Sequence, residues 1–401
     1  MTEIDVARTP ETSSSEEPAW LPALQRIAKE VTGPAATAVD REARFPRESF
    51  AALSKGGFLG AAVPVSLGGM GASIEEMSVM CETLGRRCAA TAMVFAMHHI
   101  QVACIERHRG SSRFFAEYLR EVAEKQRLIA SVTSEAGVGG STRTSVAPIE
   151  RDGELCKFRK DGTVVSYGEN ADDLLVTVRR SADAPMNDQA LVLVRRSACS
   201  MERTGSWDTL GMRGTCSPGY IVAATFPEEQ VLESPFSDIS SMTMVPFAHL
   251  LWGSAWLGIA ADAVARARMH VRDVARQMPG TVPPGAVRLS EVSTPLQLMR
   301  TQIRDLAREF DSLASRPDRG KSVLTSVGYA LRMNALKISS SELVVDIVTR
   351  ALRIVGTSGY RNDSRYSLTR HLRDAHSAAL MIGNERMHGA NAALLLVHKD
   401  D

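Results

Sequence analysis

Near the end of the chain, the stretch RDAHSAALMIGNER (373–386) brings together residue types that can transfer protons. A charged cluster runs into the four apolar residues ALMI and then into a Gly-Asn break, after which Glu385 follows. A carboxylate can act as a general base when it lies within hydrogen-bond reach of the reacting atom. The structural alternative is that Glu385 caps or solvates the start of a helix, and that Arg370, Arg373 and Asp374 form a salt-bridge cluster.

Three histidines elsewhere in the chain are further candidates for acid–base chemistry, because the unperturbed pKa of histidine is roughly 6.5. His98 and His99 lie in a mostly apolar helical stretch, and consecutive helix positions point about 100° apart, so at most one of them would face a ligand. Histidines in such a stretch are more commonly hydrogen-bonded core residues. His249, in VPFAHLLWGSAWLGIA, is suited to act as a general base at neutral pH.

The composition excludes several classes of function. With 401 residues, of which 44% are hydrophobic and 23% charged, the chain can bury a large core and form two or three domains. Its 47 lysines and arginines nearly cancel its 46 aspartates and glutamates, so no overall field favours nucleic acid or an anionic membrane. The six cysteines form no CxxC pair and no metal-site spacing, which predicts no bound metal and reduced thiols in the cytoplasm. No apolar run approaches the roughly 20 residues that a membrane span needs.

Three regions with different hydrophobic periods must position these candidates. Residues 1–18 are rich in Ser, Thr, Glu and Pro, and are predicted to form a disordered tail that is not a signal peptide. Apolar residues at three- and four-residue spacing predict helices over 19–126, with a break at AAVPVSLGGMGAS and helix resuming at Ile74. The period changes to two over 127–235, and helices return over 236–401.

The middle region contains the short runs RLIASVT, TVVSYG, DLLVTVRR, QALVLVRR and GYIVAATF, which are separated by turn residues. Such runs are typical of an antiparallel barrel or sandwich. In the last region, LQLMRTQIRDLAREFDSL has apolar residues at alternating three- and four-residue steps, which predicts a helix packed in a bundle. Another long helix is predicted over roughly 321–355. The sequence therefore predicts an α+β chain.

Three stretches occur in an order that is informative together. They are FPRESFAALSKGGFLGAAVPVSLGGMG, WDTLGMRGTCSPGYIVAATFPEEQVL with its Leu-Gly-x-Arg-Gly-Thr turn, and ALRIVGTSGYRNDSRYSLTRHLRDA with its glycine-rich turn and Arg-Asp-Ala stretch. In these stretches the chain resembles the acyl-CoA dehydrogenase superfamily of flavoproteins. The resemblance implies an N-terminal helical domain, a central antiparallel β domain and a C-terminal four-helix bundle, with the flavin between the last two.

The resemblance also implies the cofactor and its contacts. The flavin is expected to be FAD, with FMN as the alternative. Matched segments place Thr133, Ser134, Ser141 and Ser166 near the isoalloxazine, although strand-end hydroxyls in turns are the structural alternative. Val164 replaces the family's tryptophan, so one aromatic wall is lost. Gly356 and Gly359 are also expected to bind the flavin. In the family these glycines come from a neighbouring subunit, which implies a homotetramer or homodimer. Arg213, His98 and His99 are expected at the substrate side.

Compared with the dehydrogenases that it resembles, this chain lacks the catalytic carboxylate. Family dehydrogenases use a carboxylate to remove the proton α to a thioester while a hydride passes to the flavin. The common position for this base, eight residues after the Asp of Arg-Asp-Ala, corresponds to Ile382. A second known position corresponds to Ala248, with His249 in place of the adjacent arginine. Neither position holds an acid.

Three explanations remain open. In the first, the chain still dehydrogenates an acyl thioester of CoA or a carrier protein and passes electrons to an electron-transfer flavoprotein, with Glu385 or His249 as the base. In the second, it resembles the superfamily's flavin-dependent monooxygenases, which lack the carboxylate, take reduced flavin from a partner reductase and act on small aromatic or amine substrates. Histidines and Ser166 would then hold the activated oxygen. In the third, the flavin fold is kept for binding without catalysis.

Overall fold

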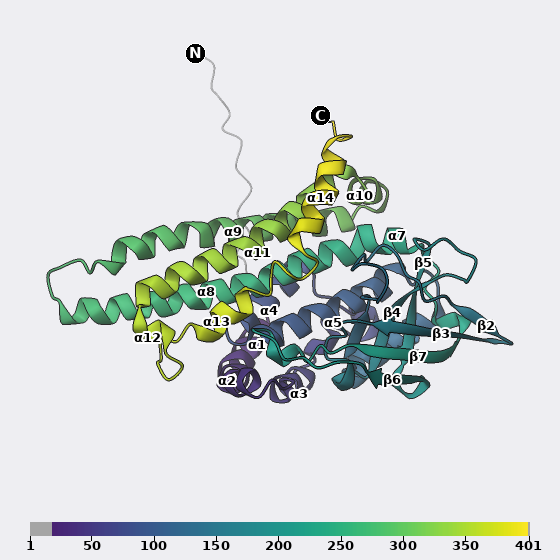
Figure 1. Cartoon of the computed structure of the whole chain (residues 1–401), viewed down its shortest axis with the longest axis horizontal. Coiled ribbons are helices and arrows are strands. Elements are labelled where there is room, and N and C mark those ends of the chain that lie inside the picture. The colour runs from purple at the N-terminus through teal and green to yellow at the C-terminus, as the bar shows by residue number, and fades with distance from the viewer. Residues whose placement is uncertain (1–17, 400–401) are drawn as a thin grey trace, which may run out of the picture.

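The computed structural model describes residues 18–399, without the side chains of residues 317 and 318, so nearly all of the predicted tail over 1–18 lies outside the described residues. Along the sequence, the chain forms a set of helices, a β domain and a bundle of long helices (Figure 1). The fold class predicted from the sequence is therefore confirmed.

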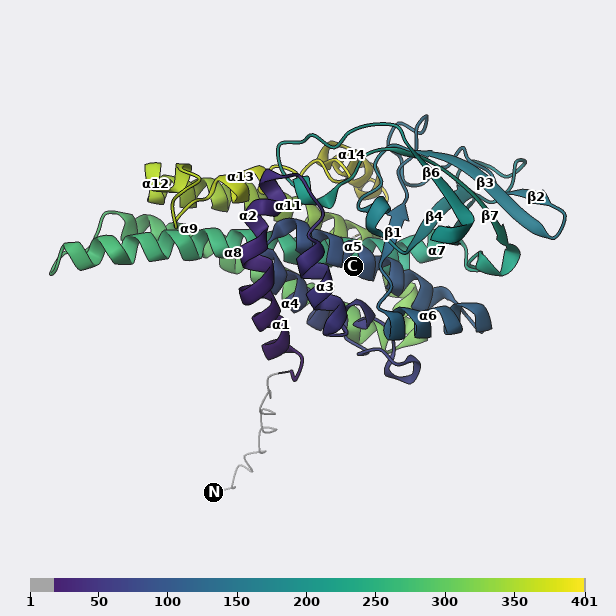
Figure 2. The same ribbon diagram turned by 90° about the horizontal axis from the view of Figure 1, so that it is seen from below.

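Helices and short turns make up the first region. They are α1 (Leu21–Ile27), η1 (Ala28–Thr32), α2 (Gly33–Arg41), α3 (Arg47–Lys55), η2 (Phe58–Gly60), η3 (Val65–Leu67), α4 (Ile74–Gly85), α5 (Ala89–His108) and α6 (Arg113–Lys125). α4 begins at Ile74, as predicted, because Ser73 and Glu76 accept hydrogen bonds from each other's backbone N–H groups in a capping box. α5 is buried along nearly its whole length and lies in the centre of the molecule (Figure 2).

Two sheets make up the β domain. The strands are β1 (Ile129–Val132), β2 (Glu150–Asp152), β3 (Leu155–Gly162), β4 (Asp173–Arg179), β5 (Gln189–Arg195), β6 (Cys199–Arg203) and β7 (Tyr220–Pro227). Their order is β1-β4-β5 in one sheet and β2-β3-β7-β6 in the other. The pairs are antiparallel, as predicted, except that β1 runs parallel to β4 with Val132 opposite Val176. β1 contacts α5, so this sheet packs against the N-terminal helical region.

The predicted strand TVVSYG does not form. After β3 ends at Gly162, the backbone turns, and Tyr167 adopts a left-handed conformation with φ of 44° that a strand cannot contain. The Tyr167 hydroxyl is buried and donates to the carbonyl of Ile129, which ties this turn to β1. The turn therefore presents Ser166 at the edge of the domain. The strands β2, β3 and β6 were not predicted, because charged residues interrupt their apolar runs.

Long helices return after β7. The elements are α7 (Phe236–Ile239), η8 (Ser240–Met244), α8 (Val245–Gln277), α9 (Gly285–Ala314), α10 (Pro317–Leu324), α11 (Val327–Val355), α12 (Thr357–Tyr360), α13 (Thr369–Ala375) and α14 (Asn384–Leu395). α8, α9 and α11 pack side by side (Figure 1), and the interrupted pair α13 and α14 completes the bundle against α11. The helix predicted over 321–355 is broken, because Ser326 caps α11 by accepting from Tyr329 N–H.

Two glycines bring α8 close to the N-terminal helices. A Cβ at Gly258 of α8 would lie 2.6 Å from the carbonyl oxygen of Glu82, and a Cβ at Gly85 of α4 would lie 2.5 Å from the carbonyl oxygen of Ala255. Only glycine allows the two backbones to approach this closely. The helical run Phe236–Gln277 is long and apolar enough to cross a membrane, but 89% of its most apolar window is buried inside the protein. The apolar character of this run is therefore explained by its position as the core helix of the bundle.

Candidate active site

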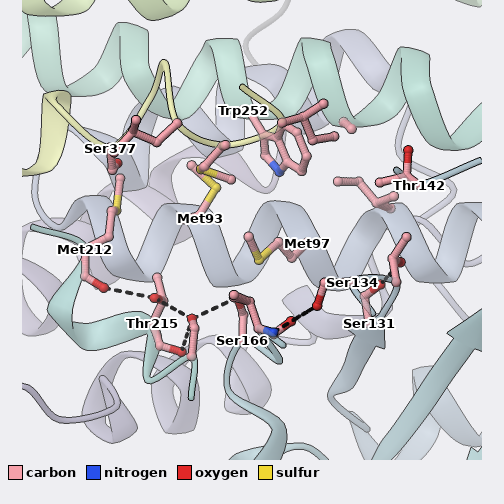
Figure 3. A pocket seen from close by; sticks show the side chains of 18 of the residues that line it. Met93, Met97, Ser131, Ser134, Thr142, Ser166, Met212, Thr215, Trp252 and Ser377 are labelled. Atoms are coloured by element: carbon pink, nitrogen blue, oxygen red, sulfur yellow. Dashed lines mark hydrogen bonds between the residues drawn. The ribbon is translucent and has the colours of Figure 1, made fainter. Parts of the chain in front are cut away.

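A cavity of about 920 Å³ lies where the β domain, α5 and the start of α8 meet. Met93 and Met97 of α5 line its middle, and Trp252 of α8 faces them from the other side (Figure 3). Hydroxyl-bearing residues of the β domain line the side opposite α8. The loop between α13 and α14 covers the remaining edge with Leu380 and Ile382. The cavity is therefore mostly apolar, with polar atoms concentrated on one side.

The polar side is a connected chain of hydroxyls. Thr215 Oγ1 donates to the carbonyl of Met212 over 2.9 Å and lies 2.8 Å from Ser217 Oγ. Ser217 Oγ in turn donates to Ser166 Oγ over 2.9 Å (Figure 3). When Ser217 directs its single proton to Ser166 and not to the carbonyl of Thr215, 3.3 Å away, the proton of Ser166 is free for a group in the cavity. The sequence singled out Ser166 and Thr215 but missed Ser217, whose only signal was its place two residues after the matched turn.

The other predicted hydroxyls lie beside this chain. Thr133 and Ser134 line the cavity at the end of β1, and Thr133 Oγ1 lies 2.8 Å from Ser131 Oγ. Ser134 Oγ accepts from the N–H of Val164 and donates to the carbonyl of Val164, so the two predicted segments are bonded to each other. Val164 lines the cavity, half exposed, where the family has a tryptophan. Ser141 does not line the cavity, and its neighbour Thr142 does.

A buried ion pair anchors the loop that carries these hydroxyls. The Glu135 carboxylate accepts from Ser145 Oγ over 2.6 Å and from the backbone N–H groups of Val146 and Ala147. Lys160 Nζ of β3 lies 3.2 Å from the same carboxylate and donates to the carbonyl of Thr177. Neither charged side chain is exposed by more than 1%. Burial lowers the pKa of Lys160, and Glu135 opposes that change by stabilising the ammonium.

The two best-matched motifs of the sequence join at the cavity. Gly211 packs so closely on α13 that a Cβ there would lie 2.1 Å from the carbonyl oxygen of Arg373. The next residue, Met212, donates its backbone N–H to the buried carboxylate of Asp374 over 2.7 Å. Burial raises the pKa of Asp374 to about 6. Arg373 lines the cavity and is paired with Asp40. Asp374 therefore binds backbone and does not line the cavity. The alternative of a salt-bridge cluster among Arg370, Arg373 and Asp374 is not what is seen, because Arg373 pairs with Asp40 and Arg370 donates to the carbonyl of Arg87.

The α8 side of the cavity carries Ala248 and His249 at the family's second base position. His249 is 3% exposed, and its Nδ1 lies 2.9 Å from the carbonyl oxygen of Met333. Because a carbonyl only accepts, Nδ1 carries the proton and Nε2 of the neutral ring is a hydrogen-bond acceptor. Burial lowers the pKa of His249 to about 4. The histidine is therefore a much weaker proton acceptor than its ordinary pKa suggested.

Ile382 lines the cavity at the family's common base position, in a strained backbone conformation. Its φ of 49° lies in the left-handed region, which β-branched residues rarely adopt. Lys337 of α11 holds this loop: its fully buried ammonium donates to the carbonyl of Ile382 over 3.1 Å and to Asn384 Oδ1 over 2.7 Å. Burial lowers the pKa of Lys337 to about 8. Glu385, which follows the loop, is exposed and lies outside the cavity lining. Over residues 18–399, no aspartate or glutamate lines the cavity.

His98 and His99 are buried in the core, and neither lines the cavity. His98 Nε2 lies 2.8 Å from the carbonyl oxygen of Leu59, and its Nδ1 accepts from the N–H of Ile129 over 3.1 Å. His99 Nε2 lies 3.1 Å from the carbonyl oxygen of Phe58. His98 therefore ties the start of β1 to α5. Both partners of His98 are distant in sequence, so no local pattern could indicate this role.

Replacing His98 by glutamine is expected to reduce the protein's sensitivity to acid. Burial lowers the pKa of His98 to about 4 from its ordinary 6.5, so between these pH values the unfolded chain binds more protons than the folded one. Stability then falls as the pH decreases through this window, by about 3 kcal/mol from this residue. Glutamine can form both hydrogen bonds without titrating. Urea unfolding should show that the free energy of unfolding falls less between pH 6.5 and pH 4.5 in the variant than in the wild type. An equal fall in both proteins would contradict this role.

The remaining predicted residues lie away from the cavity. Arg213 donates to the carbonyls of Asp40 and Thr209 and does not line the cavity. Gly356 and Gly359 lie at α12, on the opposite end of the molecule from the β domain (Figure 1). Gly356 has a φ of 67° and open space around its Cα, whereas Gly359 packs against Val355. The sequence missed Met93, Met97 and Lys337, because apolar and buried helix positions look alike whether they line a core or a cavity.

Comparisons with known proteins agree with this architecture. Residues 14–126 match the family model of the acyl-CoA dehydrogenase N-terminal domain, and residues 241–393 match that of the C-terminal domain. The probable acyl-CoA dehydrogenase FadE25 of Mycobacterium tuberculosis is 21% identical over 91% of each chain. The amino sugar nitrososynthase DnmZ of Streptomyces peucetius is 26% identical over 90% of this chain and 87% of its own. The crystal structure of the dibenzothiophene monooxygenase TdsC from Paenibacillus sp. A11-2 superposes with a TM-score of 0.79 at 19% identity, over 95% of this chain and 98% of its own.

Proposed function

Because this chain belongs to the acyl-CoA dehydrogenase superfamily, we propose that it is a flavin-dependent oxidoreductase of the monooxygenase type, which inserts oxygen into a neutral substrate. The observation that supports this reaction over α,β-dehydrogenation is that no carboxylate lines the cavity within residues 18–399. Dehydrogenation of a thioester needs a base of sufficient strength at the substrate Cα. Ile382, Ala248 and the weakly basic His249 occupy the family's base positions and do not supply one. His376 also lines the cavity, but it lies at neither of these positions.

The cavity is suited to an isoalloxazine ring. A flat apolar slot with polar groups at one edge is what the ring requires, and the hydroxyl side opposite α8 provides that edge. When bound, the flavin supplies the electrons for the reaction. FAD is the expected form, with FMN as the alternative, and the flavin-bound TdsC structure contains FMN. In this proposal Thr133, Ser134 and Ser166 contact the ring, and Val164 covers one edge of it.

A second copy of the chain would complete an FAD site. Gly356 and Gly359 lie at the end of the bundle remote from the cavity, so within one chain they cannot reach the same ligand (Figure 1). Gly356, with its positive φ and open surroundings, leaves room for a phosphate group to approach the backbone. The proposed assembly is therefore a homotetramer or homodimer in which one subunit's glycine turn meets the other's flavin.

The apolar walls would keep water from the reacting atoms. Met93, Met97 and Trp252 surround the centre of the cavity, and Lys337 holds the Ile382 loop over its edge. A site that excludes water protects reduced flavin and activated oxygen from unproductive release. Ser166 would donate its free proton to the polar edge of the ring, and Ser217 would fix the direction of that hydroxyl.

Replacing Ser166 by alanine is expected to lower the fraction of consumed oxygen that appears in product. Removal of the hydroxyl deletes the donor that the Ser217 chain aligns toward the flavin, and losing one such donor costs about tenfold or more in a reaction step. Hydrogen peroxide released per oxygen consumed should rise accordingly. Ser200→Ala, on the exposed strand β6, is the matched control and should leave the ratio unchanged. An unchanged ratio in Ser166→Ala would contradict this role.

The test of the proposed function is oxygen uptake by the flavin-loaded protein when a separate flavin reductase and NADH supply reduced flavin. A panel of neutral aromatic compounds should increase the uptake, and mass spectrometry should find products heavier by one oxygen atom. The expected partner is therefore a flavin reductase. Uptake that no compound changes, with all oxygen recovered as hydrogen peroxide, would count against the proposal.

Acyl thioester dehydrogenation is the second candidate. The match to FadE25 over 91% of both chains favours it, and an apolar cavity would also accept an acyl chain. Its partner would be an electron-transfer flavoprotein. In this candidate Glu385 would have to move from the surface into the cavity, because it is exposed in the described structure.

A further inference from the structure

The α8 side of the cavity contains an indole N–H with no hydrogen-bond acceptor. Trp252 is 8% exposed and lines the cavity, and no atom within residues 18–399 accepts from its Nε1. A buried donor without a partner costs about 1–3 kcal/mol, so an acceptor from a bound molecule would recover that free energy. Met93 and Met97 lie opposite the indole (Figure 3), and their unbranched, flexible side chains can move to admit a ligand.

One turn earlier on the same helix, His249 offers the complementary group. Its Nδ1 proton is committed to the carbonyl of Met333, so Nε2 is an acceptor on a residue that lines the cavity. Residues three apart lie on the same face of a helix, and the His249 and Trp252 rings have centroids 6.4 Å apart. A hydroxyl oxygen that accepts one hydrogen bond and donates another joins two nitrogens roughly 5 Å apart, because the two bonds meet at a bent angle. Ring nitrogens lie outside the ring centroids, so a centroid separation of 6.4 Å leaves room for one hydroxyl group between the two side chains.

The cavity lining offers no carboxylate and no unpaired guanidinium for an ionic ligand, within the part of the chain that the structure describes. No carboxylate lines the cavity within residues 18–399 to pair with an ammonium, and the guanidinium of Arg373 is paired with Asp40. His249 is neutral at pH 7, because burial lowers its pKa to about 4. A buried charge without a partner is strongly disfavoured. The ligand that fits is neutral.

We propose, on the basis of the function proposed above, that Trp252 and His249 recognise the hydroxyl group of a neutral aromatic substrate. The hydroxyl oxygen accepts from Trp252 Nε1–H, and its proton is donated to His249 Nε2. The methionines of α5 pack on the ring, which thereby lies between α8 and the hydroxyl side assigned to the flavin. No proton is transferred in this recognition.

Three probes of one shape separate the two hydrogen bonds: 2-naphthol both accepts and donates, 2-methoxynaphthalene only accepts, and 2-methylnaphthalene does neither. Calorimetric titration of the oxidised, flavin-loaded protein should give affinities that fall in this order, by about tenfold at each step. Trp252→Phe keeps an aromatic ring but removes the donor, so it should abolish the difference between the methoxy and methyl compounds while 2-naphthol keeps its advantage.

Trp256→Phe is the matched control. Trp256 is also buried with an unpartnered N–H on α8, but it does not line the cavity, so the three affinities should keep their order. If Trp252→Phe still binds the methoxy compound more tightly than the methyl compound, the indole N–H of Trp252 does not contact the ligand oxygen and the proposal is wrong. It is equally wrong if none of the three compounds binds. These titrations involve no turnover, so ordered affinities without oxygen insertion would sustain the recognition and refute only the proposed function.

Discussion

Replacement of Glu135 by glutamine is expected to lower the free energy of unfolding by about 3–5 kcal/mol, because it leaves the Lys160 ammonium buried without its counter-charge. The glutamine oxygen can still accept from the N–H groups of Val146 and Ala147, and its amide N–H can donate to Ser145 Oγ, so the loop keeps its contacts while the charge is removed. Urea unfolding followed by circular dichroism measures the loss. Flavin affinity should fall too, because this carboxylate holds the loop that follows Thr133 and Ser134.

Two further variants control this prediction. Glu150→Gln removes one partner of an exposed ion pair with Lys157 on neighbouring strands, and should change the free energy of unfolding by less than about 1 kcal/mol. In a Glu135→Gln/Lys160→Met double variant, no buried charge remains, so part of the lost stability should return. A single Glu135→Gln variant as stable as the wild type would show that the pair does not anchor the loop.

Replacement of Gly211 by alanine is expected to cost about 3 kcal/mol and to weaken flavin retention. The new Cβ would lie 2.1 Å from the carbonyl oxygen of Arg373 and 2.7 Å from the backbone nitrogen of Asp374, so α13 must move away. That shift would break the bond from Met212 N–H to Asp374 and displace the carbonyl that anchors the hydroxyl chain. Thermal unfolding and the flavin content of the purified variant measure both effects.

Gly205→Ala is the matched control for this change. Gly205 lies in the same segment between β6 and β7, and a Cβ there meets nothing within 4 Å. Its substitution should leave both stability and flavin content nearly unchanged. A Gly211→Ala variant that retains flavin and unfolds with the wild type would contradict the inference that the two motifs hold the cavity together by close backbone packing.

Much of the fold could be predicted from the sequence, because the spacing of hydrophobic residues along the chain follows the periodicity of helices and strands. The apolar seam of α9 is confirmed, with Leu296, Met299, Ile303 and Phe310 buried, and the start of α4 follows from a capping box that is visible in the sequence. The predicted strand TVVSYG failed because its β-rich composition says nothing about the left-handed turn at Tyr167. That turn depends on a hydrogen bond to Ile129, which is remote in sequence.

The candidate site could be predicted only in part, for the same physical reason. Thr133, Ser134 and Ser166 line one cavity, as the matched segments suggested, because they follow or flank strands whose ends meet. A core role for His98 and an exposed place for Glu385 at a helix start were among the alternatives drawn from the sequence. The hydrogen-bond partner of His98 could not be inferred, since it is a carbonyl 39 residues away. The acceptor role of His249 depends on Met333 of another helix.

The most direct test of the central claim, that neither of the family's base positions in this cavity holds a group able to remove a proton from a thioester, is an anaerobic titration. Oxidised, flavin-loaded protein is mixed with butyryl-CoA and with octanoyl-CoA, and the flavin absorbance is followed, with dithionite added at the end to prove that the flavin can be reduced. The account predicts that neither thioester bleaches the flavin and that dithionite does. Rapid bleaching by either thioester would contradict it and would establish the chain as an acyl thioester dehydrogenase with a base outside the positions described.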